Sequence, residues 1–424
     1  MRTAFRPSQL SDSHLRAAEH ALRTCVHCGL CTAICPTYLL LGDERDSPRG
    51  RIVLIQNMLE SFDEPSREAV LHIDRCLSCM GCRTACPSGV DYMALIDAGR
   101  AHIEKNHQRP WRDRILRAFV LRVLMRPGLF AAMAAMARMF APLASLLPGR
   151  LGAMARKAPP KIRVNKESLA TPMAGLAARR VALLNGCVQR TLAPWVDPAA
   201  RRVLARAGME AVPLNGTGCC GAVAFHLGQT ELAKKCARRI IEALEKSGLE
   251  AILITATGCS AHLKEYGRLF ENDEAWAARA ADFSAKAKDF VELVEPAAAP
   301  SRDAALSDMA IAYHPPCSLQ HAQAITGRGE ELLSAAGFRL VPFADPHLCC
   351  GSAGSYSVLQ PEIADALRAR KLAAIEAAGA QAIASGNIAC LAHLAGAGAP
   401  PAIHIAELLD WAAGGPKPAA LAGN

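Results

Sequence analysis

Long uncharged apolar runs are missing from this chain of 424 residues. Its most apolar stretch, residues 115–154, is interrupted by Arg117, Arg122, Arg126 and Arg138, whereas a transmembrane helix needs roughly 18 or more apolar residues in succession. The first ten residues also lack the apolar core of a signal peptide. We therefore expect a cytoplasmic protein, with any membrane contact peripheral and on the cytoplasmic face of the inner membrane.

The sequence also has few signatures of nucleotide binding or nucleophilic catalysis. It contains no Walker loop, no flavin fingerprint and no Ser–His–Asp spacing that would support hydrolysis. Residues 216–221 spell the G-x-G-x-x-G dinucleotide fingerprint between a predicted strand and a predicted helix. The corresponding residues 346–351 of a second copy lack its first two glycines, so we assign both loops another role. We expect this chain to bind neither flavin nor NAD and to carry no catalytic residue.

Cysteine, by contrast, is abundant, with 17 residues. Eight of them form two C-x2-C-x2-C-x3-C-P motifs, at Cys25, Cys28, Cys31 and Cys35 and at Cys76, Cys79, Cys82 and Cys86. Such motifs bind [4Fe–4S] clusters, and in two-cluster proteins the fourth cysteine of each motif ligates the other cluster. We therefore predict two [4Fe–4S] clusters, one held by Cys25, Cys28, Cys31 and Cys86 and the other by Cys76, Cys79, Cys82 and Cys35. Zinc is the alternative, but it requires neither a third closely spaced cysteine nor the proline.

Helical periodicity surrounds both motifs. It predicts helices over residues 9–24, from near Pro48 to Leu59, over 66–74 and over 92–106. The 40 residues between the motifs leave room for helices that a compact β-type ferredoxin lacks. We therefore predict an α-helical ferredoxin domain over residues 1–110.

A basic segment follows this domain. Residues 101–180 carry 16 lysines and arginines against three acidic residues, in a chain whose formal net charge is +9. Such a segment attracts anionic lipid head groups, nucleic acid or an acidic partner, and an ordinary solvated helix face is the alternative. We interpret residues 111–178 as a basic amphipathic helical segment ending in a linker over 158–178. We expect it to dock to a partner or to a membrane surface, and expect no nucleic acid.

The C-terminal half is an internal duplication, in which one set of cysteines recurs about 130 residues later. Strand-like runs over 181–184, 211–214 and 251–255, and over 309–313, 339–342 and 381–384, alternate with helical segments. This alternation predicts a parallel sheet in each of two α/β repeats, residues 179–300 and 301–424. The chain is thus predicted to be multidomain, α and α/β.

Each repeat places its cysteines just after predicted strands, where parallel sheets bind ligands. His262 and His393 follow the last cysteine of each repeat by three residues, and Gly221 and Gly351 suit a positive φ beside the paired thiols. The sites could hold a metal (iron–sulfur or zinc), form a redox thiol site, or line a pocket; soft thiolates favour a metal or redox role. Their residues are Cys187, Cys219, Cys220, Cys259 and His262 in the first repeat, and Cys317, Cys349, Cys350, Cys390 and His393 in the second.

Beyond the cysteines, several stretches resemble the iron–sulfur subunits of glycolate oxidase. They are residues 25–29 (CVHCG), 35–38 (CPTY), 48–52 (PRGRI), 86–90 (CPSGV), 218–223 (GCCGAV), 264–267 (KEYG), 319–323 (LQHAQ) and 347–354 (HLCCGSAG). The resemblance covers nearly the whole chain. It implies an electron-transfer subunit that accepts electrons from flavin-containing partner subunits, which oxidise glycolate to glyoxylate, and passes them towards a membrane quinone.

Comparison with related subunits does not decide what the Cys-Cys-Gly sites bind. In heterodisulfide reductase such repeats end in Cys-x-x-Cys and hold a cluster with five thiolates, whereas His262 and His393 stand at the last position here. The resemblance is therefore compatible with zinc, a different cluster or no metal at these sites. The alternative functions are an iron–sulfur subunit of a lactate or glycerol-3-phosphate dehydrogenase and, from another class, a zinc-bound scaffold or nucleic-acid-binding module.

Overall fold

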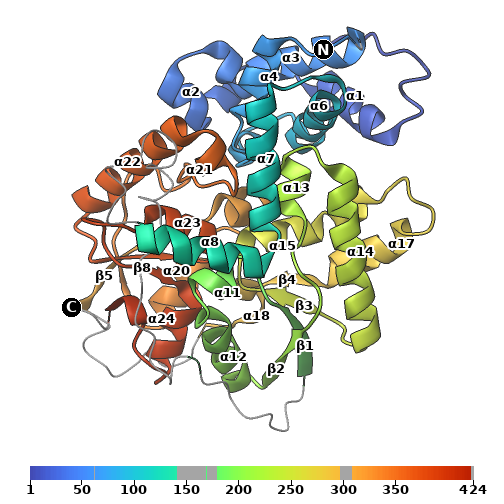
Figure 1. Ribbon diagram of the computed structural model, residues 1–424. Helices are drawn as coiled ribbons and strands as arrows, with labels where there is room; N and C mark the ends of the chain where they lie inside the picture. Colours follow the sequence, from blue (N-terminus) through green and yellow to red (C-terminus); the bar gives the residue numbers. More distant parts are fainter. Residues whose placement is uncertain (62, 141–168, 170–178, 297–307, 422–424) are drawn as a thin grey trace.

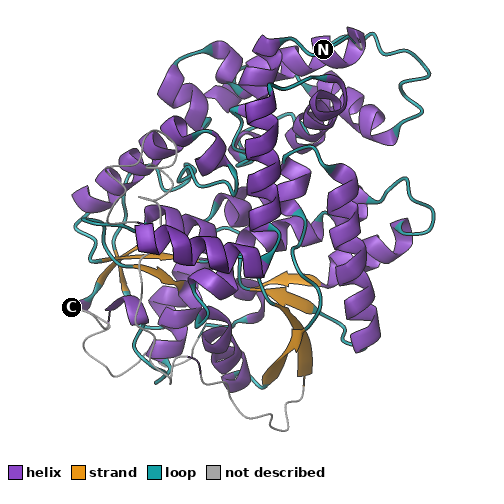
Figure 2. Cartoon of the chain, viewed as in Figure 1, coloured by secondary structure: helices purple, strands orange, loops and turns teal. Residues whose placement is uncertain are grey.

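The computed structural model describes residues 1–61, 63–140, 169, 179–296 and 308–421. Helices of the N-terminal region lie at the top of the molecule, and two α/β regions lie side by side beneath them (Figure 1). Strands occur only in these two lower regions of the described chain (Figure 2). This arrangement confirms the predicted fold class. The predicted linker, residues 158–178, lies outside the described residues except for Leu169.

The N-terminal region is a helical layer around the two cysteine motifs. Its helices are α1 (Ser13–Thr24), α2 (Pro36–Leu41), α3 (Pro48–Ser61), α4 (Arg67–Asp74), the short α5 (Gly81–Thr84) and α6 (Tyr92–Asn106). The first predicted helix begins later than expected because Asp12 caps it, accepting a hydrogen bond from the backbone N–H of His14. Leu22, Ile55 and Leu95 are fully buried in the shared core, where each stabilises the fold by roughly 1.5–3 kcal/mol.

The basic segment forms two helices, α7 (Trp111–Leu124) and α8 (Pro127–Phe140). Helix α7 descends from the N-terminal layer along the α/β regions, and α8 runs across them (Figure 1). Within the described residues, no single helix has the length and apolar character needed to cross a membrane. The α7–α8 pair meets the criteria of length and composition jointly, with a bend of 107° between the two helices.

Each α/β region contains a parallel sheet of four strands in the same order. The first sheet runs β2 (Met209–Leu214), β1 (Arg179–Leu184), β3 (Ile252–Ile254) and β4 (Ala287–Asp289). The second runs β6 (Arg339–Leu340), β5 (Ala310–Tyr313), β7 (Ala382–Ser385) and β8 (Ala402–His404). The fourth strand of each sheet was missed from the sequence, because three residues are too short to show a period.

Helices cover both sheets in equivalent positions. The first repeat has α11 (Gln189–Leu192), α12 (Val196–Arg206), α13 (Ala222–His226), α14 (Thr230–Ser247), α15 (Thr257–Lys264), α16 (Tyr266–Leu269), α17 (Ala277–Lys286) and α18 (Phe290–Leu293). The second has a π-helical turn, Ser318–Ala322, and then α20 (Arg328–Ala335), α21 (Tyr356–Leu359), α22 (Pro361–Ala377), α23 (Ile388–Leu394) and α24 (Ile405–Ala412).

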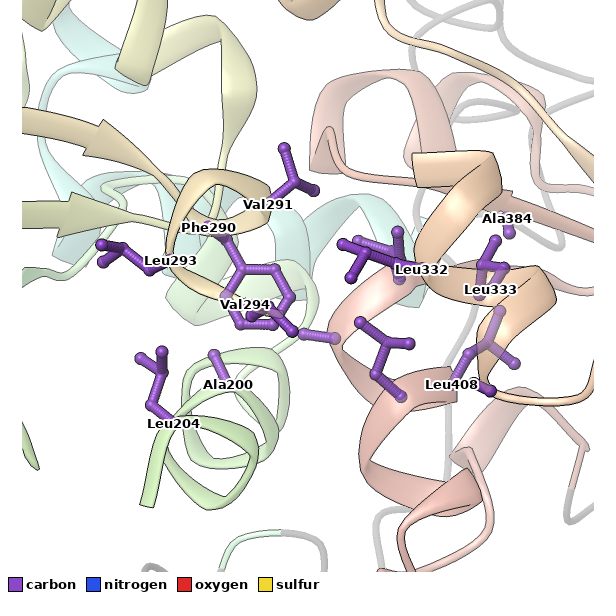
Figure 3. Close-up of a cluster of buried hydrophobic side chains, with 14 of the residues drawn as sticks. Ala200, Leu204, Phe290, Val291, Leu293, Val294, Leu332, Leu333, Ala384 and Leu408 are labelled. Carbon is purple, nitrogen blue, oxygen red and sulfur yellow. The ribbon is translucent and has the colours of Figure 1, made fainter. Parts of the chain in front are cut away.

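The two repeats share one hydrophobic core (Figure 3). Helix α12 of the first repeat packs on α24 of the second repeat. In the same way, α20 of the second repeat, which corresponds to α12, packs on α18 of the first repeat, which corresponds to α24. Asp410 is buried at the α12–α24 contact and accepts hydrogen bonds from Arg202 and Arg206, each at 2.7 Å. Because each repeat uses the same two helices to contact the other, the two repeats are related by an approximate two-fold axis.

Candidate metal centres

The two cysteine loops of the N-terminal region have the same backbone conformation. His27 and Gly29 adopt positive φ angles of 56° and 81° in the first loop, and Ser78 and Met80 adopt 52° and 59° at the same places in the second. Left-handed residues between the cysteines turn the chain sharply, so that it can wrap around a central group. A non-glycine residue in this region is uncommon, and such residues concentrate at functional sites.

The first predicted ligand set lines one hollow. Cys25, Cys28, Cys31 and Cys86 all contribute to its wall, and so does Cys82 of the second motif. The structure therefore brings the last cysteine of the second motif to the loop of the first. Cys28 is exposed, and the neighbouring Val26 and Leu30 are exposed by 68% and 57%. This loop faces solvent.

The second predicted ligand set gathers around Cys35. Burial and then the charges of Cys79, Cys76, Cys35 and Cys31 raise the pKa of the Cys82 thiol, so Cys35 and Cys31 both lie near the cysteines of the second motif. The crossed arrangement is the one that two cubes would require, and the ligand assignment itself stays a prediction.

The thiol spacing suits cubes better than single ions. With Zn–S bonds of about 2.3 Å, the sulfurs around one zinc ion lie roughly 3.8 Å apart. In the described chain, the eight thiols form no group of three whose sulfurs all lie within 4.8 Å of one another. A cube separates its four ligands more widely, and thiolates in C-x2-C-x2-C-x3-C-P loops are its usual ligands. The residues present therefore fit the predicted clusters.

A buried cation borders the second set. Arg51 is only 1% exposed and donates to the carbonyl oxygen of His72 at 2.7 Å and to Oδ1 of Asp46 at 3.2 Å. Its Nη1 also points to Cys35 Sγ at 3.9 Å. Burial alone would lower the pKa of Arg51, but Cys76, Tyr92, Cys35 and Asp46 raise it above its ordinary value. Arg51 therefore keeps its charge beside the sulfurs, a role that the sequence did not reveal.

Further donors surround Cys76. Tyr92 donates its hydroxyl to Cys76 Sγ at 3.9 Å, and the backbone N–H of Ser78 donates to the same sulfur at 3.5 Å. Arg100 donates to the carbonyl oxygen of Cys76 and to Oγ of Ser78, both at 2.6 Å. Hydrogen bonds to sulfur and nearby positive charge are the means by which a protein sets the reduction potential of a cluster.

In the first Cys-Cys-Gly repeat, hydrogen bonds link Cys187, Cys219, Cys220 and Cys259 in a chain of thiols. Hydrogen bonds from Cys187 and Cys220 lower the pKa of Cys219, so this sulfur is the preferred thiolate. His262 is buried beside this chain and packs on the rings of Phe225, His226 and Tyr266. Burial, with the charge of His226 adding to it, lowers the pKa of His262 to about 3, which keeps its ring neutral.

The second repeat has the same chain of thiols, from Cys317 through Cys349 and Cys350 to Cys390. His393, however, uses Nε2 to bond the carbonyl oxygen of Ala364 at 3.2 Å. The histidine that approaches the thiols is His314, which the sequence analysis did not single out: a ring nitrogen of His314 and the sulfurs of Cys350 and Cys390 all lie within 4.8 Å of one another.

The glycines after the paired thiols behave as predicted. Gly221 and Gly351 have φ angles of +91° and +94°. A Cβ at Gly351 would meet the carbonyl oxygen of Ala364 at 2.6 Å, and one at Gly221 would meet that of Ala233 at 3.1 Å. Only glycine combines the left-handed conformation with so close an approach to a helix.

Both Cys-Cys-Gly sites open into one cavity of about 950 Å³ beneath the N-terminal layer. The second site lies against the second cysteine loop, since the charge of Cys317 is a cause of the raised pKa of Cys79. Tyr356 of the second repeat donates to the carbonyl oxygen of Arg75 at 2.8 Å, and His321 Nδ1 lies 2.8 Å from Thr84 Oγ1. All the cysteine sites of the described chain thus form a connected series.

Comparison with known proteins agrees with this geometry. The sequence model of a 4Fe-4S dicluster domain matches residues 21–90, and that of a cysteine-rich domain with the Cys-Cys-Gly signature matches residues 181–264 and 311–395. The glycolate oxidase iron-sulfur subunit of Escherichia coli (strain K12) is 41% identical over 97% of this chain and 99% of its own length. The chain belongs to the glycolate oxidase iron–sulfur subunit family. It is therefore an iron–sulfur electron-transfer subunit, as the sequence predicted.

Other proteins are similar to this chain at lower identity. The probable glycolate oxidase iron-sulfur subunit of Bacillus subtilis (strain 168) is 31% identical over 94% of this chain and 96% of its own length. Lactate utilization protein A of an Exiguobacterium species is 30% identical, but the match covers 54% of this chain and 96% of that protein. A hypothetical protein from Helicobacter pylori has a similar fold, with a TM-score of 0.56 over 96% of this chain and 73% of its own, at 9% identity.

Proposed function

We propose that this chain carries electrons within a complex that oxidises glycolate to glyoxylate. Flavin-containing partner subunits perform the oxidation, and the two clusters pass the electrons on towards a membrane quinone. The crossed cysteine arrangement supports the proposal, because it would hold two cubes close together and next to a third thiol site. The relatives named for glycolate oxidase match this chain over 94% and 97% of its length, whereas the lactate relative matches about half, so glycolate is the favoured substrate.

Electrons enter, in this proposal, at the first cysteine loop. Cys28 is exposed and flanked by the exposed apolar side chains Val26 and Leu30, which suit contact with a partner protein. The second loop lies near Arg51 and Arg100, whose positive charges stabilise a reduced cluster and raise its potential. Electrons that arrive at the cluster of the exposed loop therefore move to the higher reduction potential of the buried loop, and then towards the Cys-Cys-Gly repeats.

The test uses the complex purified from its native host under anaerobic conditions. Glycolate, lactate and glycerol-3-phosphate are supplied in turn, and dye reduction and cluster reduction are followed by absorbance and electron paramagnetic resonance. Glycolate should reduce both clusters fastest. A Cys28→Ser variant should stop dye reduction while the flavin partner is still reduced. Faster reduction by lactate would instead support the alternative that the chain serves a lactate dehydrogenase.

Helix α7 offers a surface for the membrane contact. Trp111, Ile115 and Phe119 are exposed along one side of it, and Arg122 in its last turn and Arg126 just after its end are exposed as well. Aromatic and apolar side chains flanked by arginine are typical of helices that lie at an anionic lipid surface. Other arginines of this segment are already engaged: Arg109 and Arg117 donate to Asp74 at 2.6 and 2.7 Å.

The membrane contact is tested on the full chain with vesicles. A double variant, Arg122→Glu with Arg126→Glu, should lose flotation with vesicles that contain anionic phospholipid. The wild-type chain should not float with purely zwitterionic vesicles. The control is Arg279→Glu on α17, which replaces a half-buried arginine paired with Glu245, far along the chain from α7. Unchanged flotation of the double variant would contradict membrane docking through α7.

A further inference from the structure

The imidazole of His314 is buried without a hydrogen-bond partner. His314 follows strand β5 and is 1% exposed, and neither of its ring nitrogens has a partner in the described structure. Its backbone is fixed on both sides, because its N–H donates to Ala384 at 2.8 Å and its carbonyl accepts from Ser385 Oγ at 2.9 Å. A buried polar group left unsatisfied costs roughly 1–3 kcal/mol, so its position calls for an explanation.

Thiols converge on this ring from two other elements. Cys350 belongs to the loop before α21 and Cys390 to the first turn of α23, and they are 1% and 3% exposed. Their sulfurs and a ring nitrogen of His314 lie within 4.8 Å of one another. Cys349 is hydrogen-bonded to Cys350 and is also buried. Two thiols and one imidazole therefore converge, and the third thiol, Cys349, is hydrogen-bonded to one of them where the site borders the cavity.

We propose that the second repeat binds one zinc ion through His314, Cys349, Cys350 and Cys390. Three cysteines and one histidine in a closed site form a common structural zinc set. Bonds of about 2.3 Å to sulfur and 2.0–2.1 Å to nitrogen place neighbouring donors roughly 3.3–3.8 Å apart. Small side-chain shifts bring the three measured donors to these distances, whereas the ligands of a cube would have to lie farther apart. The proposal does not depend on which substrate the complex oxidises.

The surroundings of the site complement bound thiolates. Asn387 donates its side-chain N–H to Cys390 Sγ at 3.4 Å. Lys371 is 3% exposed, and Cys350, Cys349 and Cys390 act on it electrostatically, so it lies close enough to interact with their charges. Zinc with three thiolates and a neutral imidazole has a net charge of −1, which this lysine offsets. Hydrogen bonds and charges of this kind orient metal ligands and hold them in place.

The first repeat provides an internal contrast. Leu184, the last residue of β1, stands where the second repeat has His314, three residues before the first cysteine. The nearby histidine, His262, lies on α15 among aromatic rings. Among the described residues, no three donor atoms of the first repeat gather within 4.8 Å. The proposal therefore predicts one zinc ion per chain and not two.

The test measures metal on the full chain purified anaerobically. Zinc and iron are counted, and the zinc X-ray absorption edge is recorded. We expect one zinc per chain, with three sulfurs at about 2.3 Å and one nitrogen at about 2.0 Å. His314→Gln should lose the zinc while keeping its iron and visible spectrum. His393→Gln and His262→Gln, which change the histidines of the Cys-x-x-His motifs, should keep it.

A conservative variant guards against misfolding. His314→Cys should retain zinc with four sulfurs and no nitrogen, so a loss in His314→Gln is attributable to the missing ligand. Absence of zinc from the wild-type chain would overturn the proposal, as would zinc that survives in His314→Gln. Iron in excess of two cubes, lost with Cys350→Ser, would also overturn it, because the site would then hold an iron–sulfur centre.

Discussion

The two cysteine loops share their spacing and their left-handed residues, yet they differ in surroundings. The first exposes Cys28, Val26 and Leu30. In the second, Cys76 accepts from Tyr92 and the neighbouring Cys35 from Arg51. The spacing of the cysteines therefore selects the kind of cluster. The residues packed around each loop set the reduction potential of that cluster and determine which cysteine site lies next to it. The following predictions test this contrast.

The largest effect is expected from the two cysteines that cross between the loops. Cys86→Ser should remove the first cluster and Cys35→Ser the second, each with a loss of about four irons, since each thiol belongs to the cube of the other motif. Iron counts and electron paramagnetic resonance measure the result. The spectrum of Cys86→Ser should match that of Cys28→Ser, and that of Cys35→Ser should match Cys79→Ser. The opposite pairing would show that the ligands are not crossed.

Arg51→Gln should affect the second cluster alone. It removes a positive charge next to Cys35 and breaks a buried pair with Asp46, which should lower the potential of that cluster and cost about 3–5 kcal/mol of stability. Redox titration and urea unfolding measure the two effects. Arg49→Gln is the matched control beside the first loop: its pair with Glu44 is partly exposed, so its loss should cost less than about 1 kcal/mol. Equal losses of stability in the two variants would show that the surroundings of the two loops do not differ in this respect.

Gly29→Ala should weaken the first loop by roughly 1–3 kcal/mol. The residue has φ +81°, and an added Cβ would lie 2.8 Å from Nη1 of Arg49. Thermal unfolding of the anaerobic protein measures the loss. Gly89→Ala is the control, since its φ is +67° but nothing lies within 4 Å of its Cβ. We expect a smaller loss there, and a greater loss at Gly89 than at Gly29 would rule out the close approach as the cause.

The smallest effect concerns pH. Burial, opposed by Arg268 and Arg100, raises the pKa of Asp97 to about 7. As the pH rises through 7, the carboxyl group ionises near Arg100, so the potential of the second cluster should fall. The stability that the protonated group contributes falls as the pH rises from about 4, where an unfolded Asp ionises, to about 7, where the folded group does. Asp97→Asn should flatten both dependences, as measured by redox titration and urea unfolding from pH 6 to 8. The first cluster should show no change.

Much of this architecture was predictable because its signals are local. Helix α6 occupies the predicted residues 92–106, since Asp91 caps its start and its apolar residues recur at helical spacing. The duplication of cysteines predicted two sheets, and both occur. The two cluster loops were likewise predictable, because short spacing between cysteines restricts the backbone.

The parts that the sequence did not predict depend on long-range packing. Arg51 acts on Cys35 only because α3 lies beside α2 and α4. His314 meets thiols that lie 36 and 76 residues further along the chain, whereas the motif drew attention to His393. A histidine three residues before a cysteine, present in one copy and absent from the other, was the signal that could have identified it.

The exchanged packing of α12 on α24 and of α18 on α20 has a consequence for the history of the chain. Two identical copies of one α/β repeat could use the same contacts to form a symmetric homodimer. Joining two such copies in one chain would free each repeat to change alone, because a substitution would no longer appear twice. A leucine in one repeat at the place of a histidine in the other is a difference that two identical copies could not hold. A single repeat produced separately should therefore dimerise or aggregate rather than remain a stable monomer.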